Sequence, residues 1–203
     1  RLRACGARVI DVYDNRIHAM SGVDAHCVDP SLADDFTLLF QQLKAQSLLP
    51  HGIVFAWGLS ETTADSDLPY TALSYLGSAL NSLATKLVAS PPTQGAAHFD
   101  TQKQASLLLI NNHTAEVMGH EQICPCKSML AVAGEVIAYE QQLNFCSVDI
   151  SLPDEDERQL GGRRRVTIDQ LMRILAVPHH EWHWLAPVAV RGRHCWQRKF
   201  SAI

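Results

Sequence analysis

The sequence predicts one α/β domain with a mainly parallel sheet and helices on both faces. Short, almost wholly apolar runs of strand length alternate with longer segments whose apolar residues recur at helical spacing. Runs without polar alternation are typical of parallel strands that are covered on both faces. A length of 203 residues suits a single hydrophobic core. We therefore treat residues 1–203 as one domain.

The N-terminal elements are predicted from turn residues and from apolar spacing. A last helical turn over residues 1–5 leads through Gly6 into a β-branched strand over 6–13. Pro30 and the aspartates that follow it favour the start of a helix, which we expect from about 32 to 48. Residues three, four and seven positions apart give this helix an apolar face: Phe36, Leu39, Phe40 and Leu43.

The middle of the chain repeats the pattern of strand, helix and strand. The apolar run over 52–57 predicts a strand in the centre of the sheet. Leucines at helical spacing predict a helix over 70–88, and a second apolar run predicts a strand over 105–110. This order predicts a doubly wound sheet with right-handed crossovers.

The alternation continues to the C-terminus. In chain order we expect a helix over 127–142, a strand over 145–150, a charged loop over 151–165, a short helix over 167–175 and a last strand or hairpin over 186–200. Gly192 is placed at the turn of that hairpin.

Composition and charge exclude several classes of function. A formal net charge of -4 and an isoelectric point near 6.2 provide no broad basic surface for nucleic acid. The longest apolar stretches are far shorter than the roughly 20 residues that span a bilayer, so we expect no membrane partner. Six scattered cysteines favour a reduced, cytoplasmic protein. The start at Arg1, without Met or a signal sequence, favours a piece of a longer polypeptide.

Sequence motifs for nucleotide binding and reductase chemistry are absent. The eleven glycines form neither G-x-G-x-x-G nor G-x-x-x-x-G-K, the patterns that bring backbone N–H groups to phosphates. A short-chain reductase needs a Lys four positions after its catalytic Tyr, and Ile17, Ser74, Ala79 and Leu143 occupy those positions here. We predict no catalytic, cofactor-binding or metal-binding residue in this chain.

Two motifs leave an alternative open, which is an autonomous hydrolase or a metal-dependent enzyme. Ser60 lies in an incomplete G-x-S-x-G pattern whose last position is Thr62, and we interpret it as a loop serine. The cluster from His179 to His183 lacks the H-E-x-x-H order of zinc proteins, and we interpret it as a surface pair of histidines.

Two other clusters are also interpreted structurally. Cys124 and Cys126 form a C-x-C without a second pair at ligand spacing, and we expect two loop thiols. The run Arg163–Arg165 is interpreted as a solvated loop, with a docking patch for an acidic domain as the alternative.

Three stretches, taken together, resemble the structural subdomain of polyketide synthase ketoreductases. They comprise residues 6–12 with 28–36 and 52–57, residues 105–110 and 115–117 with 125–140 and 145–150, and residues 188–196. The resemblance implies a truncated Rossmann-like fold of the short-chain dehydrogenase type, without cofactor. Members of that family begin with a strand that this chain lacks, so the first strand is expected to be missing or to lie outside residues 1–203.

The resemblance also implies a function. The chain is expected to be a non-catalytic scaffold of a modular polyketide synthase, supporting a neighbouring ketoreductase catalytic subdomain or another modifying domain. NADPH and the catalytic Ser, Tyr and Lys would belong to that catalytic subdomain, outside this chain. Whether the parent ketoreductase is active or vestigial stays open.

Overall fold

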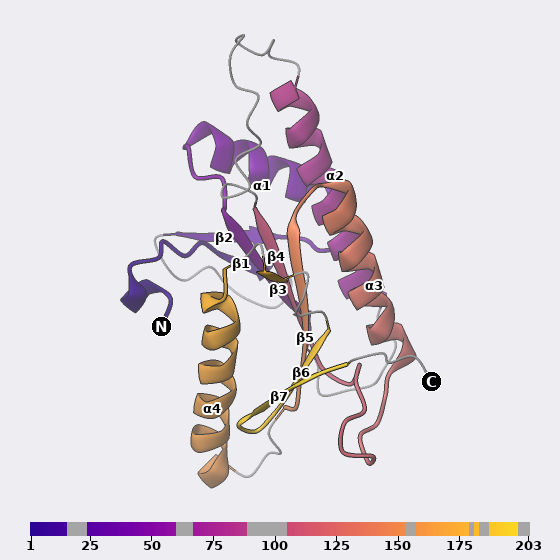
Figure 1. Cartoon of the computed structure of the whole chain (residues 1–203). Coiled ribbons are helices and arrows are strands. Elements are labelled where there is room, and N and C mark those ends of the chain that lie inside the picture. Colours follow the sequence, from indigo (N-terminus) through magenta and orange to yellow (C-terminus); the bar gives the residue numbers. More distant parts are fainter. Residues whose placement is uncertain are drawn as a thin grey trace.

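The strands form two sheets (Figure 1). The computed structural model describes residues 1–15, 24–59, 67–88, 105–152, 157–178, 181–182 and 187–198. In the smaller sheet, β1 (Asp11–Asp14) pairs in parallel with β2 (Ala25–Val28). The larger sheet has the order β3-β4-β5-β6-β7, with β3 at Gly52–Gly58, β4 at Ser106–Asn111, β5 at Asn144–Ile150, β6 at Val188–Arg191 and β7 at His194–Gln197.

Helices cover both faces of the larger sheet, which confirms the predicted fold class. Strands β3 to β6 run parallel, and β7 pairs antiparallel with β6. The helices are α1 (Ala33–Ala45), α2 (Leu68–Val88), α3 (Pro125–Glu140) and α4 (Glu157–Ala176). Alternate side chains of β4 enter different cores, because successive residues of a strand point to opposite faces. Leu107 and Leu109 pack with α1, α2 and α3, whereas Leu108 and Ile110 pack with Ile174 of α4.

Helix α1 buries the apolar face that its sequence predicts. Phe36, Leu39, Phe40 and Leu43 are its buried residues. The carboxylate of Asp35 accepts a hydrogen bond from the backbone N–H of Asp29 at 2.8 Å and so ties the helix start to the end of β2. The helix ends two residues before Ser47, which adopts a left-handed conformation with φ of 56°.

Among the strands that the structure describes, β3 lies at an edge of the larger sheet, so the prediction of a central strand was wrong. Val54 is 46% exposed. The apolar run indicates burial, but pairing partners come from distant segments that the run does not specify. The predicted single doubly wound sheet also differs from the structure, because β1 and β2 form a separate sheet. The sequence analysis missed β2, a four-residue strand without an Ile or Val run.

The charged segment before residue 165 is helical where the sequence predicted a loop. Helix α4 includes Gly161, Gly162 and Arg163–Arg165, and these residues are exposed. Each glycine costs about 1 kcal/mol in a helix interior relative to Ala. Burial of Gln170 and Ile174 in the C-terminal half of α4 offsets the low helix propensity of these glycines.

The two ends of the described chain follow the prediction more closely. A short 3-10 helix over Arg3–Cys5 ends at Gly6, which has φ of 84°, and β1 begins at Asp11 rather than at Gly6. The C-terminal hairpin of β6 and β7 turns at Gly192, with φ of 57°. Among the helices that the structure describes, none has the length and apolar character needed to cross a membrane.

Candidate functional site

The carboxyl ends of β4, β5 and β6 carry a network of charged residues. This end of a parallel sheet is where α/β proteins usually bind ligands, so it is the first place to search for a site. Asp149 lies on β5 and is 3% exposed, and Arg191 ends β6 and is 11% exposed at its side chain. The loop that follows β4 contributes Thr114 and Glu121.

Asp149 is held from two sides. One carboxylate oxygen, Oδ1, accepts hydrogen bonds from the backbone N–H and the hydroxyl of Thr114, both at 2.8 Å. The other oxygen, Oδ2, pairs with Nη2 of Arg191 at 2.6 Å. These charge-assisted bonds compensate the cost of removing a carboxylate from water.

Arg191 joins three segments through its guanidinium. Nη2 also donates to the backbone carbonyl of Ala115 at 2.6 Å, and Nε donates to Oε1 of Glu121 at 3.0 Å. Nη1 donates to the carbonyls of Val190 and Asp149 at 3.1 and 3.4 Å. The arginine therefore fastens the loop after β4 to β5 and β6.

The carboxylate of Glu121 gathers the backbone of its own loop. It accepts hydrogen bonds from the N–H groups of residues 117–120 at 2.9–3.4 Å. Burial by itself would raise the pKa of Glu121, but the hydrogen bonds from Arg191 and from the backbone of Met118 and Val117 lower it from 4.5 to about 2. The ionised form of Glu121 is thus the form that the folded loop stabilises.

We predict that Glu121 makes stability depend on pH in the acid range. Because its folded pKa lies below the unfolded value, the contribution is complete above about pH 5 and is lost as the pH falls toward 2. Glu121→Gln should lower the thermal midpoint at pH 7, and the difference from the unsubstituted protein should shrink between about pH 5 and pH 2. Thermal unfolding followed by circular dichroism across this range measures both.

The matched control for this prediction is Glu135→Gln on α3, where the glutamate is exposed. It should shift the midpoint little at any pH. A Glu121→Gln difference that stays constant between about pH 5 and pH 2 would contradict the assignment.

A polar pair, Lys127 and Asn112, lies near Asp149 of this network. Lys127, in the first turn of α3, is 8% exposed, and its Nζ donates to Oδ1 of Asn112 at 2.6 Å. Burial lowers the pKa of Lys127, and the nearby Cys124 and Asp149 partly offset that shift. The pair connects the start of α3 to the end of β4.

Asn111, the last residue of β4, lies close to the end of β3. It is fully buried, and neither atom of its side-chain amide has a hydrogen-bond partner in the structure. A Cβ atom added at Gly58 would lie 2.2 Å from Oδ1 of Asn111. The glycine is therefore required for the amide to occupy this position.

Within the described residues, the charged groups of this network bind one another and nearby backbone. The donors of Arg191 contact oxygens of the protein itself, and the carboxylates of Asp149 and Glu121 accept from neighbouring backbone, hydroxyl and guanidinium groups. Over the described ranges, no group of three or more His, Cys, Asp or Glu side chains is arranged to hold a metal ion. Chemically, this arrangement fixes a loop on the strand ends.

The motifs that the sequence singled out are not part of this network. Ser60, His179 and His183 lie outside the described residues, so the alternative sites based on them stay predictions. Cys124 is buried just before α3 and Cys126 is exposed in its first turn, so the loop assignment was wrong for Cys126. Arg163–Arg165 are exposed, but they lie on a helix.

Sequence reasoning assigned no role to the charged residues of the network. A signal for them existed, since Asp149 interrupts a predicted apolar strand and Arg191 ends another. Glu121 had no such signal, because it lies in an irregular loop and its partners are either 70 residues away or within four residues of it.

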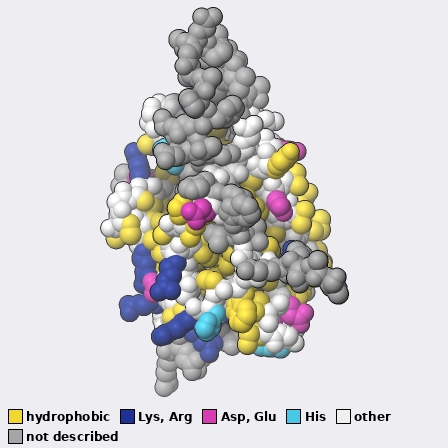
Figure 2. All heavy atoms as spheres, viewed as in Figure 1, with side chains coloured by type: hydrophobic (Ala, Val, Ile, Leu, Met, Phe, Trp, Pro, Cys, Tyr) yellow, Lys and Arg dark blue, Asp and Glu magenta, His cyan; other side chains and the backbone are white. Residues whose placement is uncertain are grey.

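Helix α3 presents the other distinctive surface. Its outer side exposes four large apolar residues at positions three, four and three apart: Met129, Val132, Val136 and Tyr139, with exposures of 57, 62, 50 and 87%. Figure 2 shows hydrophobic side chains at the surface on the side of the molecule that α3 occupies in Figure 1. We refer to these four residues as the α3 stripe. Apolar patches of this kind mark interaction surfaces when they are contiguous.

No protein-family model and no curated protein matches this chain.

Proposed function

We propose that this chain is a non-catalytic structural domain of a modular polyketide synthase. Its role is to support a neighbouring ketoreductase catalytic subdomain, or another modifying domain, of the same polypeptide. The observation that carries the proposal is the α3 stripe, because a helix that packs on the sheet through one side and exposes four large apolar residues on the other is suited to docking.

The charged network supports the non-catalytic part of the proposal. The carboxyl ends of the strands would face the nucleotide in a dinucleotide-binding α/β domain. Here Arg191, Asp149 and Glu121 use this region to hold the loop after β4. In the proposal, NADPH binds to the catalytic subdomain and not to this chain.

The identity of the partner rests on the resemblance described above, and the cysteines are consistent with it. All six are in the thiol form rather than in disulfides, which fits a cytoplasmic assembly. The partner surface that suits the α3 stripe is apolar, because burial of Met129 and Val132 is favourable when they contact other apolar groups.

We predict that charges on the α3 stripe weaken domain association. The double variant Val132→Glu/Val136→Glu should raise the dissociation constant for the ketoreductase catalytic subdomain of the same polypeptide by about tenfold or more. The reason is that two carboxylates would have to be buried against apolar surface. Isothermal titration calorimetry between the separately expressed subdomains measures the effect.

The matched control is Leu38→Glu, since this leucine is 52% exposed and belongs to α1 rather than to α3. It should leave the dissociation constant unchanged, and far-ultraviolet circular dichroism should show all variants folded. Equal binding by the double variant and the unsubstituted chain would refute docking through α3. A micromolar dissociation constant for NADPH on this chain alone would refute the non-catalytic assignment.

A further inference from the structure

The surface formed by α4 and the turn between β6 and β7 carries an excess of positive charge. Residues 161–176 contain four arginines and one acidic residue, Asp169, and residues 188–198 contain no acidic residue. Asp169 is itself paired with the guanidinium of Arg1. Figure 2 shows Lys and Arg side chains gathered on the side of the molecule that α4 occupies in Figure 1. This concentration contrasts with the formal net charge of -4 of the whole chain.

Five exposed arginines make up this surface, and we refer to them as the arginine surface: Arg163, Arg164, Arg165, Arg173 and Arg193. Among the described residues, none of these side chains has a carboxylate partner at ion-pair distance. Because like charges repel, a run of three arginines does not by itself stabilise the helix. The described part of the fold therefore makes no use of their charge.

Two hydrogen bonds join the turn between β6 and β7 to α4. Nε2 of Gln170 donates to the backbone carbonyl of Arg193 at 3.0 Å, and Sγ of Cys195 donates to Oε1 of Gln170 at 3.4 Å. Burial raises the pKa of the Cys195 thiol, and the positive charge of Arg173 partly offsets this shift, so Arg173 lies near the same turn. Arg173 and Arg193 therefore belong to one continuous surface.

Arg165 and Arg173 lie on the same side of α4. They are eight residues apart with Asp169 midway, and residues four apart on a helix are neighbours along one side. At a rise of 1.5 Å per residue, the two positions are about 12 Å apart along the helix axis. A helix that lies along α4, and has carboxylates at the same four-residue spacing, can face both guanidinium groups.

We propose that the arginine surface is a docking site for an acidic helix of another protein domain. The guanidinium group suits such a partner, because its planar set of donors can bind a carboxylate through two parallel hydrogen bonds. The five cations of the surface are all arginine, the residue that suits interface ion pairs better than lysine. The net charge of -4 repels a long phosphate backbone, which favours a protein partner over a nucleic acid.

This site is separate from the α3 stripe and does not depend on the function proposed for it. The exposed charged residues of α3 are Glu135 and Glu140, and both would repel an acidic helix. The two surfaces therefore select partners of different chemistry, one apolar and the other acidic.

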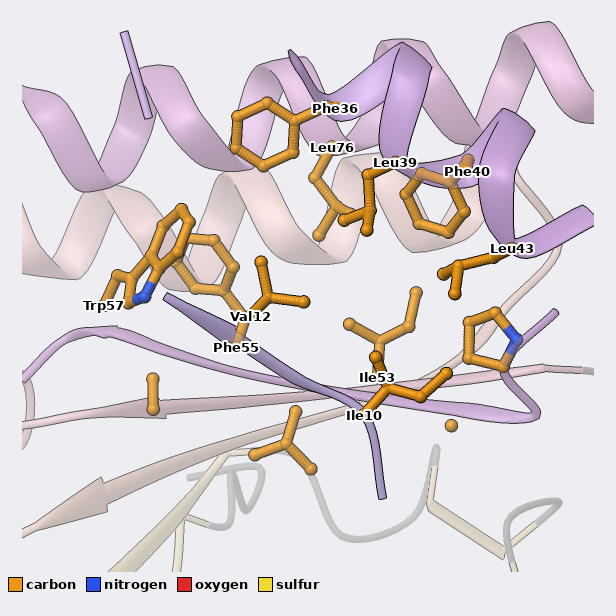
Figure 3. A pocket seen from close by; sticks show the side chains of 14 residues that line it. Ile10, Val12, Phe36, Leu39, Phe40, Leu43, Ile53, Phe55, Trp57 and Leu76 are labelled. Carbon is orange, nitrogen blue, oxygen red and sulfur yellow. The ribbon is translucent and has the colours of Figure 1, made fainter. Parts of the chain in front are cut away.

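The cavity beneath α1 provides an internal reference. Its volume is about 180 Å³, and Figure 3 shows side chains of α1 and β3 around it, among them Phe40 and Ile53. None of the described residues that line it is charged. An acidic helix finds no opposite charge there, so the amide of Ile53 should not respond to it.

Two helical peptides of equal composition test the proposal. Each has about 20 residues and is rich in Ala, so that it is helical in water. One carries its glutamates along one side at a spacing of four residues, and the other carries the same glutamates distributed around the helix. NMR of the isotope-labelled 203-residue chain follows the titration at low ionic strength. The one-sided peptide should bind about fivefold more tightly, or tighter still, and should shift amides at 163–173 and 193–195.

Charge reversal on the arginine surface provides the second arm. Arg165→Glu/Arg173→Glu should raise the dissociation constant for the one-sided peptide by about tenfold or more. The matched control is Arg8→Glu/Lys44→Glu, which changes the net charge equally at exposed residues outside the arginine surface. It should have a much smaller effect, and circular dichroism should show both variants folded.

A variant of the α3 stripe separates this proposal from the function proposed above. Val132→Glu/Val136→Glu should bind the one-sided peptide as the unsubstituted chain does, even though it weakens the association expected of α3. Loss of peptide binding in this variant would place the acidic helix on α3 and overturn the assignment to α4.

Four other results would overturn the proposal. One is equal affinity for the two peptides, or no binding of either at about 1 mM. Another is equal affinity of the Arg165→Glu/Arg173→Glu variant and its control. The third is a peptide-induced shift at Ile53 in place of shifts on α4. The fourth is tighter binding of double-stranded DNA or of phosphatidylserine vesicles through the same arginines, which would assign the surface to a phosphate-bearing partner.

Discussion

Replacing Arg191 with methionine is expected to lower the free energy of unfolding by about 3–5 kcal/mol, the range measured when one partner of a buried ion pair is removed. The variant keeps much of the aliphatic volume but removes the guanidinium. Asp149, which is 3% exposed, would then be a buried carboxylate whose remaining hydrogen bonds, among the contacts described above, come from Thr114. Glu121 would also lose the hydrogen bond that it accepts from Nε of Arg191.

Urea unfolding at neutral pH measures this loss, and two variants identify its cause. Arg3→Met removes an arginine that pairs with Asp11 at 2.6 Å, but both side chains are substantially exposed, so the loss of stability should be far smaller than for Arg191→Met. Asp149→Asn in the Arg191→Met background removes the buried charge and should restore part of the stability. If Arg191→Met costs no more than Arg3→Met, the network does not hold the strand ends together.

Trp182→Ala is expected to lower the free energy of unfolding by about 3–5 kcal/mol, as for other large aromatic residues truncated in a core. Trp182 is 1% exposed and packs in the core between the sheet and α4, with Val148, Val188 and Ile174. Its indole N–H donates to the carbonyl of Val177 at 3.2 Å and so joins this side chain to the end of α4. The variant loses both the packing and the hydrogen bond.

The chain offers a matched control in Trp196 of β7, which is 48% exposed. Trp196→Ala removes the same atoms from a partly solvated position and should cost far less than Trp182→Ala. Both are measured by urea unfolding followed by circular dichroism, because fluorescence would change with the number of tryptophans. Equal losses for the two variants would show that Trp182 is not a core residue.

Local patterns in the sequence predicted most helices and strands. The apolar runs that became β4 and β5 and the leucine spacing that became α2 carry their signal within one element. Burial of every residue of β4 follows the absence of polar alternation in its sequence. Such patterns work because the side-chain period of a helix or a strand is a local property of the backbone.

The candidate site was less predictable. Glu121 and Arg191 are 70 residues apart, and nothing in either segment specifies the other as a partner. The sequence indicates a surface pair of histidines within residues 179–183, with a metal site as the alternative, whereas the described residue Trp182 within this segment is part of the core. The position of Trp182 among histidines in the sequence does not indicate whether its side chain faces the protein interior.

The sequence by itself determined the α/β class, the order of the main elements and the apolar face of α1, because each depends on residue spacing within one segment. The tertiary structure decided which strands lie at an edge, that Asp149, Arg191 and Glu121 pair, and that α4 extends through Gly161 and Gly162. These features depend on contacts between distant segments, whose burial and electrostatic energies exceed local backbone preferences. The edge position of β3 and the cavity beside it, which no single segment encodes, arise for the same reason.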